Sequence, residues 1–162
     1  MEAPARRQLT ELHICISPGD LQVNRIGWLL QNLSLERHLT KLTMDITLIG
    51  TLSTNEIFRQ FPGARDALER LDALHLINKG GFVEFNLVQA RALLLACTSI
   101  RRLHIRGQTA PVTEFLDILP ATMEELCFSW FDMWMSPWST IEGHLPTMIR
   151  SQRTPKLRRV AV

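Results

Sequence analysis

The chain has 162 residues, of which 46% are hydrophobic, and this is enough for one domain with a buried core. Its 18 Lys and Arg residues nearly balance 16 Asp and Glu residues, so charge gives no case for binding nucleic acid or an acidic membrane surface. The N-terminus lacks the apolar core of a signal peptide, and the longest fully apolar run, 92–97, is too short to span a bilayer. Three cysteines without metal-ligand spacing predict reduced thiols and a cytoplasmic or nuclear protein.

One spacing of apolar residues occurs six times. It has the form L-x-x-L-x-L, and its clearest copy is Ile100-Leu103-Ile105. The other copies begin at Leu9, Leu39, Leu71, Met123 and Leu157. Apolar and polar residues alternate within each copy, as in a strand that is buried on one face only. The sequence therefore predicts six strands, over 9–16, 39–46, 71–77, 100–106, 123–130 and 157–162.

Helical patterns separate these strands. The first expected helix covers 21–33, where Ile26, Leu29, Leu30 and Leu33 form an apolar stripe. Gly27 weakens it by about 1 kcal/mol, so this helix must depend on tertiary packing. Further helices are expected over 55–61, 64–70, 87–98 and 111–119, and a last one begins after 139 and breaks near Pro146.

The connections between strands decide the architecture. Strands joined by a helical crossover are parallel, and units spaced 23 to 34 residues apart are too small to bury an apolar face alone. A doubly wound sheet is one alternative, but its strands would be continuously apolar. Here Arg, His, Glu and Lys occupy alternate places in the strands, so one face of the sheet is expected to be exposed to solvent. We therefore predict an α/β solenoid of about six βα units with a curved parallel sheet, forming a single domain over 1–162.

The six copies resemble the motif of leucine-rich repeat proteins. The sequence departs from that family in two ways: most copies lack the Asn or Cys expected after the sixth place, and the spacing varies from 23 to 34 residues. Irregular repeats such as 100–107 and 123–130 resemble the repeat region of fungal F-box proteins. In that family an F-box binds a Skp1-type adaptor, and the repeats capture a substrate for ubiquitination. No Leu-Pro-led F-box segment precedes Leu9, so the resemblance implies only the substrate-recognition part.

The candidate binding residues are those that flank the fourth place of each motif, because they face the open side of a stacked sheet. They are Glu11, His13, Lys41, Thr43, His75, Arg102, His104, Arg106, Glu125 and Cys127. Across neighbouring strands, about 4.8 Å apart, His75, His104 and Cys127 should form a row. Such a row is an ordinary polar contact face, a pH-sensitive surface or a zinc site. Ligands in a line do not make a tetrahedron, so no metal is predicted.

Two further groups have alternative interpretations. Trp130, Trp134 and Trp138 are four residues apart, and they either cover the core or form an exposed aromatic anchor for a partner. Arg106 and the pairs Arg101-Arg102 and Arg158-Arg159 suggest binding of phosphate or an acidic peptide. Lateral ion pairs are the favoured alternative, because overall charge is balanced and Glu124-Glu125 is close.

Function follows from these patterns only as a set of hypotheses. The sequence contains no nucleophile elbow, phosphate-binding loop, dinucleotide fingerprint or metalloprotease motif, so we predict a protein that is not an enzyme and has no cofactor. We expect a module that binds a protein partner, as the substrate-recognition part of an F-box-type ubiquitin ligase adaptor. The alternatives are a stand-alone structural or inhibitory repeat protein and a fragment of a doubly wound enzyme. The last strand, ending at Val162, would have an open edge, which predicts a truncated product or a piece of a longer array.

Overall fold

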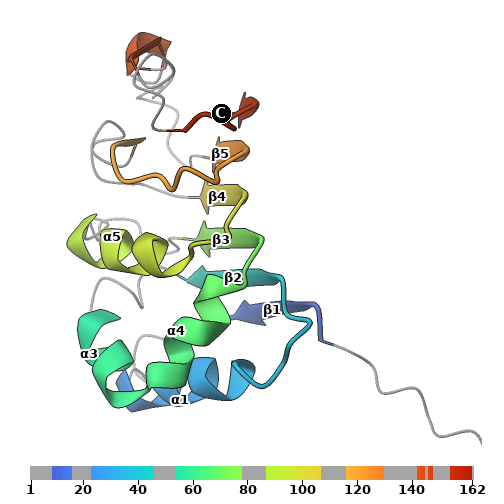
Figure 1. Ribbon diagram of the computed structural model, residues 1–162, viewed down its shortest axis with the longest axis vertical. Helices are drawn as coiled ribbons and strands as arrows, with labels where there is room; N and C mark the ends of the chain where they lie inside the picture. Colours follow the sequence, from blue (N-terminus) through green and yellow to red (C-terminus); the bar gives the residue numbers. More distant parts are fainter. Residues whose placement is uncertain are drawn as a thin grey trace, which may run out of the picture.

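The computed structural model describes residues 9–15, 23–45, 54–77, 87–106, 116–129, 142–144, 146–147 and 154–161. Its centre is one six-stranded sheet in which every neighbouring pair is parallel and the strand order follows the chain (Figure 1). The strands are β1 (Glu11–Ile14), β2 (Lys41–Asp45), β3 (Ala73–Ile77), β4 (Arg102–Arg106), β5 (Glu125–Ser129) and β6 (Arg159–Ala161). A doubly wound sheet requires a reversal of strand order, and this sheet has none.

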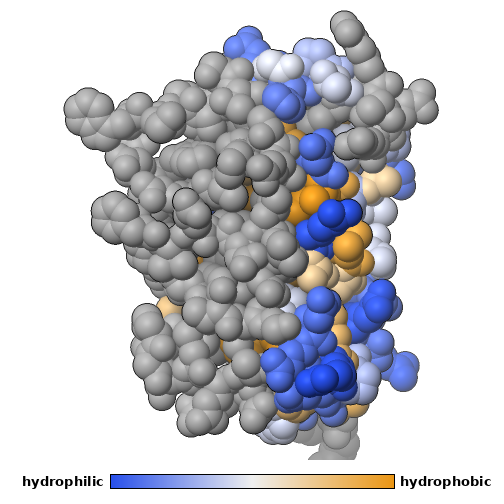
Figure 2. Space-filling model, turned by 90° about the vertical axis from the view of Figure 1, so that its left-hand side faces the viewer, coloured by the Kyte–Doolittle hydropathy of each residue, from blue (hydrophilic) through white to orange (hydrophobic). Residues whose placement is uncertain are grey.

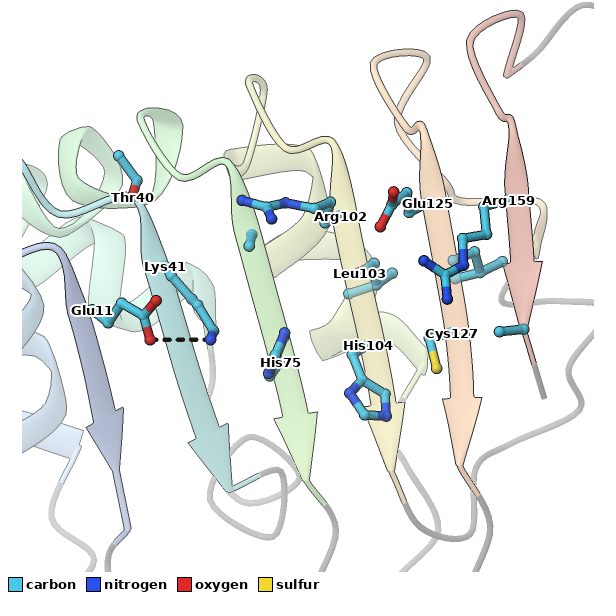
Figure 3. Close-up of a pocket in the computed structure, with 13 residues that line it drawn as sticks. Glu11, Thr40, Lys41, His75, Arg102, Leu103, His104, Glu125, Cys127 and Arg159 are labelled. Atoms are coloured by element: carbon cyan, nitrogen blue, oxygen red, sulfur yellow. Dashed lines mark hydrogen bonds and ion pairs between the residues drawn. The ribbon is translucent and has the colours of Figure 1, made fainter.

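The described helices all lie on one side of the sheet, to the left and below in Figure 1 and behind the strands in Figure 3. They are α1 (Val23–Leu33), α3 (Thr54–Gln60), α4 (Pro62–Glu69) and α5 (Leu87–Ala96). Alternation of strands with helices, predicted from the sequence, is confirmed. None of these helices is long and apolar enough to cross a bilayer; α1, the longest, has 11 residues.

The core lies between the sheet and these helices. Every fourth and sixth motif residue in β2 to β5 is buried, from Leu42 and Met44 to Leu126 and Phe128. In α1 the predicted stripe is correct, since Ile26, Leu30 and Leu33 are buried and Leu29 packs against them. Each strand therefore presents its apolar side to the helices and its polar side to the opposite face, which no described helix covers.

The strands start later than the sequence predicts, at the third motif place instead of the first. In five units the first motif residue closes a turn, because its backbone N–H donates to the carbonyl three residues earlier. Leu71, for example, bonds to Leu68 at 3.2 Å, and Ile100 bonds to Cys97 at 3.3 Å. The first motif residue is apolar because it packs in the core at this turn, as the complete burial of Ile100 shows.

A forked hydrogen bond links each unit to the next. The carbonyl of the second motif residue accepts two backbone N–H groups, from the second and third motif residues of the following unit. Asp72, for example, accepts from Arg101 at 2.9 Å and from Arg102 at 3.0 Å. The same fork occurs at all five junctions between the six strands, so one geometry repeats along the sheet.

Helices α1 and α4 pack closely, and two contacts explain how. Gly27 of α1 faces the ring of Phe61, the residue that precedes α4, at a distance that leaves no room for a β-carbon. Arg70, after α4, donates through Nη2 to the carbonyl of Ser34 at 2.7 Å, beyond the C-terminus of α1. A guanidinium at this end also opposes the negative end of the helix dipole.

The remaining helix predictions are correct in part. Helix α4 begins at Pro62, where the sequence suggested a break before 64–70, because proline fits the first turn of a helix. Of the helix expected over 111–119, the part 111–115 lies outside the described residues, and 116–119 forms a single turn with Leu116 and Leu119 buried. Residues 142–144 and 146–147 are helical, which agrees with a helix after 139, but Pro146 is itself helical and does not mark the predicted break.

Candidate binding surface

The outer face of the sheet, opposite the helices, carries the predicted polar residues in rows. The strand register places His75 beside His104 and His104 beside Cys127, and it aligns Thr43 with His13 and with His75. The parallel row at the strand starts is Glu11, Lys41, Ala73, Arg102, Glu125 and Arg159. Since the third motif place begins every strand, the register could be read directly from the motif.

A shallow hollow of about 370 Å³ runs across this face (Figure 3), and residues of all six strands line it. Of the ten predicted residues, seven line the hollow: Glu11, Lys41, His75, Arg102, His104, Glu125 and Cys127. His13, Thr43 and Arg106 lie on the same face but outside the lining. Six further residues line it, which are Thr40, Ala73, Leu103, Leu126, Arg159 and Ala161. Of these, Ala73, Arg159 and Ala161 also flank the fourth place of their motifs, so the sequence placed them on this face.

The hollow forms where short side chains interrupt the rows. Ala73 lies in register between Lys41 and Arg102, which have long side chains, whereas its own side chain is a single methyl group. Ala161 lies in the same way beside Cys127 at the β6 edge. The alanines in these two rows were therefore a signal in the sequence for where the face is hollowed.

At the β1 end of the hollow the charges are neutralised. Lys41 donates through Nζ to a carboxylate oxygen of Glu11 at 3.0 Å (Figure 3). Both side chains reach solvent, so this ion pair contributes little to stability, about 0 to 1 kcal/mol.

Two arginines converge on one carboxylate beside the hollow. Asp72 accepts hydrogen bonds from the guanidinium groups of Arg101 and Arg102, with Arg102 Nε at 3.1 Å. Burial would raise the pKa of Asp72, whose side chain is 18% exposed, but the hydrogen bonds and charges of Arg102 and Arg101 lower it below its ordinary value. The interpretation of Arg101-Arg102 as lateral ion pairs is therefore confirmed, although their partner is Asp72 and not the nearby Glu124-Glu125.

The centre of the hollow holds a pair of imidazoles. The rings of His75 and His104 meet edge to face, with centroids 5.2 Å apart and an interplanar angle of 73°. The Nε2 atom of His104 lies 2.9 Å from Ser129 Oγ, in hydrogen-bonding contact. Ser129 ends β5, two motif places beyond the row of the two histidines.

The surroundings of both imidazoles favour the neutral form. Burial lowers the pKa of His75, and the charges of His104, Lys41 and Arg102 lower it further against an opposing effect of Glu11. Burial also lowers the pKa of His104, with a smaller effect from Arg106. Near pH 7 the two rings are therefore neutral and act as hydrogen-bonding groups. Within the described part of the chain, no three His, Cys, Asp or Glu side chains are placed to hold a metal ion.

The three cysteines differ in their access to solvent. Cys15 is exposed, Cys127 is half-buried in the lining of the hollow, and Cys97 is fully buried behind the sheet. Burial raises the pKa of the Cys97 thiol to about 12. Cys97 is therefore a hydrophobic core residue, whereas Cys127 is available to a ligand in the hollow.

The β6 end of the hollow carries Arg159. Its side chain extends from β6 back over β5 toward Cys127 (Figure 3). Among the described residues, no carboxylate forms an ion pair with Arg159 or with its neighbour Arg158. Glu125 lies opposite Arg159 in the register but makes no hydrogen bond to it.

Other surfaces of the molecule have fewer features that indicate a binding site. The predicted aromatic anchor, Trp130, Trp134 and Trp138, lies outside the described residues. Where described residues are visible in Figure 2, hydrophilic and hydrophobic side chains alternate over short distances. Among the described residues the exposed large hydrophobic side chains are Trp28, Leu35 and Leu95, on or just beyond helices α1 and α5.

Comparison of the chain with protein-family models, with curated proteins and with solved structures gave no match.

Proposed function

We propose that this protein is a leucine-rich-repeat-like module that binds a protein partner on the outer face of its sheet. The observation that carries the proposal is that the described helices cover only one face, while the other presents rows of polar side chains around a hollow crossed by all six strands. No described helix covers this face, and it has the mixed polarity of protein-binding surfaces.

The repeated backbone geometry supports the assignment to a repeat solenoid. The same turn precedes five of the six strands, and the same forked hydrogen bond joins every pair of units. In a repeat array each unit contacts mainly its neighbours, and sequential strand order is the expected result. The wide range of unit lengths is accommodated on the helical side, because the strands and their junctions stay alike.

The chemistry of the face favours recognition over catalysis. His104 contacts Ser129. Among the described residues on the outer face, however, the neighbour of the His104 ring is His75, and no carboxylate is placed to orient the imidazole. A nucleophile activated by histidine normally requires such an orienting group. Neutral imidazoles, a thiol and guanidinium groups are instead suited to hydrogen bonds with a polypeptide.

Within this class we propose that the module is the substrate-recognition part of an F-box-type ubiquitin ligase adaptor. The support is the resemblance of the irregular repeats to those of fungal F-box proteins. A stand-alone structural or inhibitory repeat protein, without any role in ubiquitination, is the second candidate. Copurification separates them: a Skp1-type adaptor should be captured with a longer gene product carrying an upstream F-box, and its absence there would favour the stand-alone protein.

Affinity capture with two matched charge swaps tests whether the outer face binds the partner. One bait carries Glu125→Lys with Arg159→Glu, on the outer face, and the other carries Glu36→Lys with Arg37→Glu, beyond the end of α1. Both leave net charge unchanged and alter exposed side chains only. We expect the first bait to lose a partner that wild-type protein and the second bait retain. Equal capture by all three baits would place binding elsewhere and overturn the proposal.

A further inference from the structure

We propose that the hollow binds an extended acidic segment of the partner polypeptide, with one carboxylate of that segment held by Arg159. The inference rests on the proposed function, since it assumes that the partner docks on the outer face. It adds the chemistry and the conformation of the bound segment.

Comparison of two equivalent arginine pairs provides the first step. Arg101-Arg102 and Arg158-Arg159 occupy the second and third places of their motifs, at β4 and at β6. Asp72, in the preceding unit, holds both members of the first pair. The residue at the same place before β6 is Glu124, and it forms no ion pair with the second pair. The repeat thus contains one satisfied guanidinium pair and one that lacks a carboxylate among the described residues.

The direction of Arg159 provides the second step. Arg102 and Arg159 both extend toward the preceding strand, and Arg102 meets Asp72 there (Figure 3). Arg159 extends in the same way over β5 and lines the hollow, whereas Arg158 does not line it. A guanidinium presents paired N–H donors that match a carboxylate, so the ligand group best suited to this place is an acidic side chain.

The shape of the hollow provides the third step. Its volume of about 370 Å³ is at the small end for ligand sites, yet its lining extends from Glu11 on β1 to Arg159 on β6. Five spacings between parallel strands amount to about 24 Å, which about seven residues of extended polypeptide would cover. A compact ligand or a single small ion would leave most of this length empty. An extended peptide can cover this length while only part of it enters the hollow.

The distribution of charge fixes where the acidic residue lies. At the β1 end Lys41 is neutralised by Glu11, and Arg102 in the middle is held by Asp72. The two imidazoles, on β3 and β4, contribute no charge near pH 7. The positive charge available to a ligand is therefore at the β6 end, where Glu125 stands beside Arg159 as a competing carboxylate.

Peptide binding measured by fluorescence anisotropy tests the inference on the whole chain. The probe is a fluorescein-labelled octapeptide of alternating Ser and Glu, and its control has Gln in place of Glu. We expect wild-type protein to bind the Glu peptide about tenfold more tightly, the scale of one charge-assisted contact. Arg159→Gln should remove that preference, Arg158→Gln should retain it, and Glu125→Gln should increase it by removing the competing carboxylate.

The control variants define what would overturn the inference. Arg158→Gln makes the same change of charge one residue away and outside the hollow, so an equal loss in both variants would indicate unspecific attraction. Equal binding of the Glu and Gln peptides would exclude a carboxylate site. Displacement by inorganic phosphate, beyond that caused by chloride at the same ionic strength, would show a site for free anions instead of a peptide. The peptide experiments can contradict this inference while the Glu125 and Arg159 charge swap still abolishes capture of a partner. In that case the proposed function stands, and only the inference of an acidic segment is wrong.

Discussion

Gly27 faces Phe61 so closely that a β-carbon at position 27 would overlap the Cδ2 atom of the phenyl ring. It would also lie 2.9 Å from Cγ, the ring atom nearest the backbone, so no small rotation of the side chain removes the clash. Glycine lowers helix propensity by about 1 kcal/mol relative to alanine. In α1 this loss of helix propensity is offset, because the absence of a side chain at glycine allows α1 and the start of α4 to approach each other closely.

Gly27→Ala should therefore destabilise the protein, although alanine is the better helix former. Overpacking of a core contact costs about 1 to 3 kcal/mol, which exceeds the gain in propensity. Urea denaturation measures the free energy of unfolding. Gly143→Ala is the matched control, because its added β-carbon would meet no atom within 4 Å, and we expect no loss there. An increase in stability for Gly27→Ala would contradict the close packing of α1 against Phe61.

Asp72→Asn should reduce stability by about 1 kcal/mol at neutral pH, since both arginine partners are more than half exposed and solvent weakens each pair. The pKa of Asp72 is lowered in the folded protein, so its contribution is present above the unfolded value of 3.8 and is lost as pH falls through the lower folded value. Denaturation curves of the two proteins should therefore differ at neutral pH and converge only when the pH falls below the lowered pKa of Asp72 in the folded protein.

The matched control for this pair is Glu69→Gln, which removes the exposed ion pair between Arg65 and Glu69 of α4. A pair at this helical spacing contributes about 0.3 to 0.5 kcal/mol. If Asp72→Asn costs no more than Glu69→Gln, the convergence of two arginines on Asp72 contributes nothing beyond an ordinary surface pair.

Acidification should destabilise the fold through His75 and His104. Both pKa values are lowered in the folded protein, by burial first, so the unfolded chain binds more protons as pH falls through 6.5. Stability is therefore greatest above this pH and decreases toward pH 5. Replacing both histidines by Gln should flatten the decrease, as measured by urea denaturation between pH 7.5 and about 5.

His13→Gln supplies the control, because His13 belongs to the same row but is exposed and outside the hollow. His75 and His104 are intact in this variant, so the decrease toward pH 5 that they cause should persist. A titration of the imidazole signals by nuclear magnetic resonance gives an independent check. Measured pKa values of His75 and His104 at or above 6.5 would contradict the predicted effect of burial.

Cys97 should be unreactive in the folded protein. Its thiol is fully buried and has a pKa of about 12, so almost no thiolate is accessible to a maleimide at pH 8. A variant with Cys15→Ser and Cys127→Ser retains only Cys97, and its labelling should proceed at the rate of unfolding. A variant that retains only the exposed Cys15 should be labelled at once. Rapid labelling of Cys97 without loss of stability would show that it is not in the core.

Much of the fold could be predicted from the sequence because one face of every strand is buried. The alternation in Leu103-His104-Ile105 decides which side chains point to the helices, and a slip of one residue would place His104 in the core. The repeated motif then fixes the register, since equivalent places align. The row of His75, His104 and Cys127 follows from these two facts alone.

Strand starts were predicted less well. Leu71 and Ile100 look like the first residues of their strands, but each closes a turn to the residue three places before it. An apolar residue in such a turn and one in a strand give the same hydrophobic pattern. Only the backbone hydrogen bonds distinguish them.

By itself the sequence determined the parallel stack, the buried and open faces, and seven of the residues that line the hollow. Only the tertiary structure decided that Asp72 binds Arg101 and Arg102, that Arg159 lies without a carboxylate partner among the described residues, and that Gly27 meets Phe61. The physical reason is one of range. Alternation and repeat spacing are local features of the sequence, and they determine to which face of the sheet each side chain points. Ion pairs and close packing instead depend on distances of a few ångströms between side chains that are about 30 residues apart in the sequence.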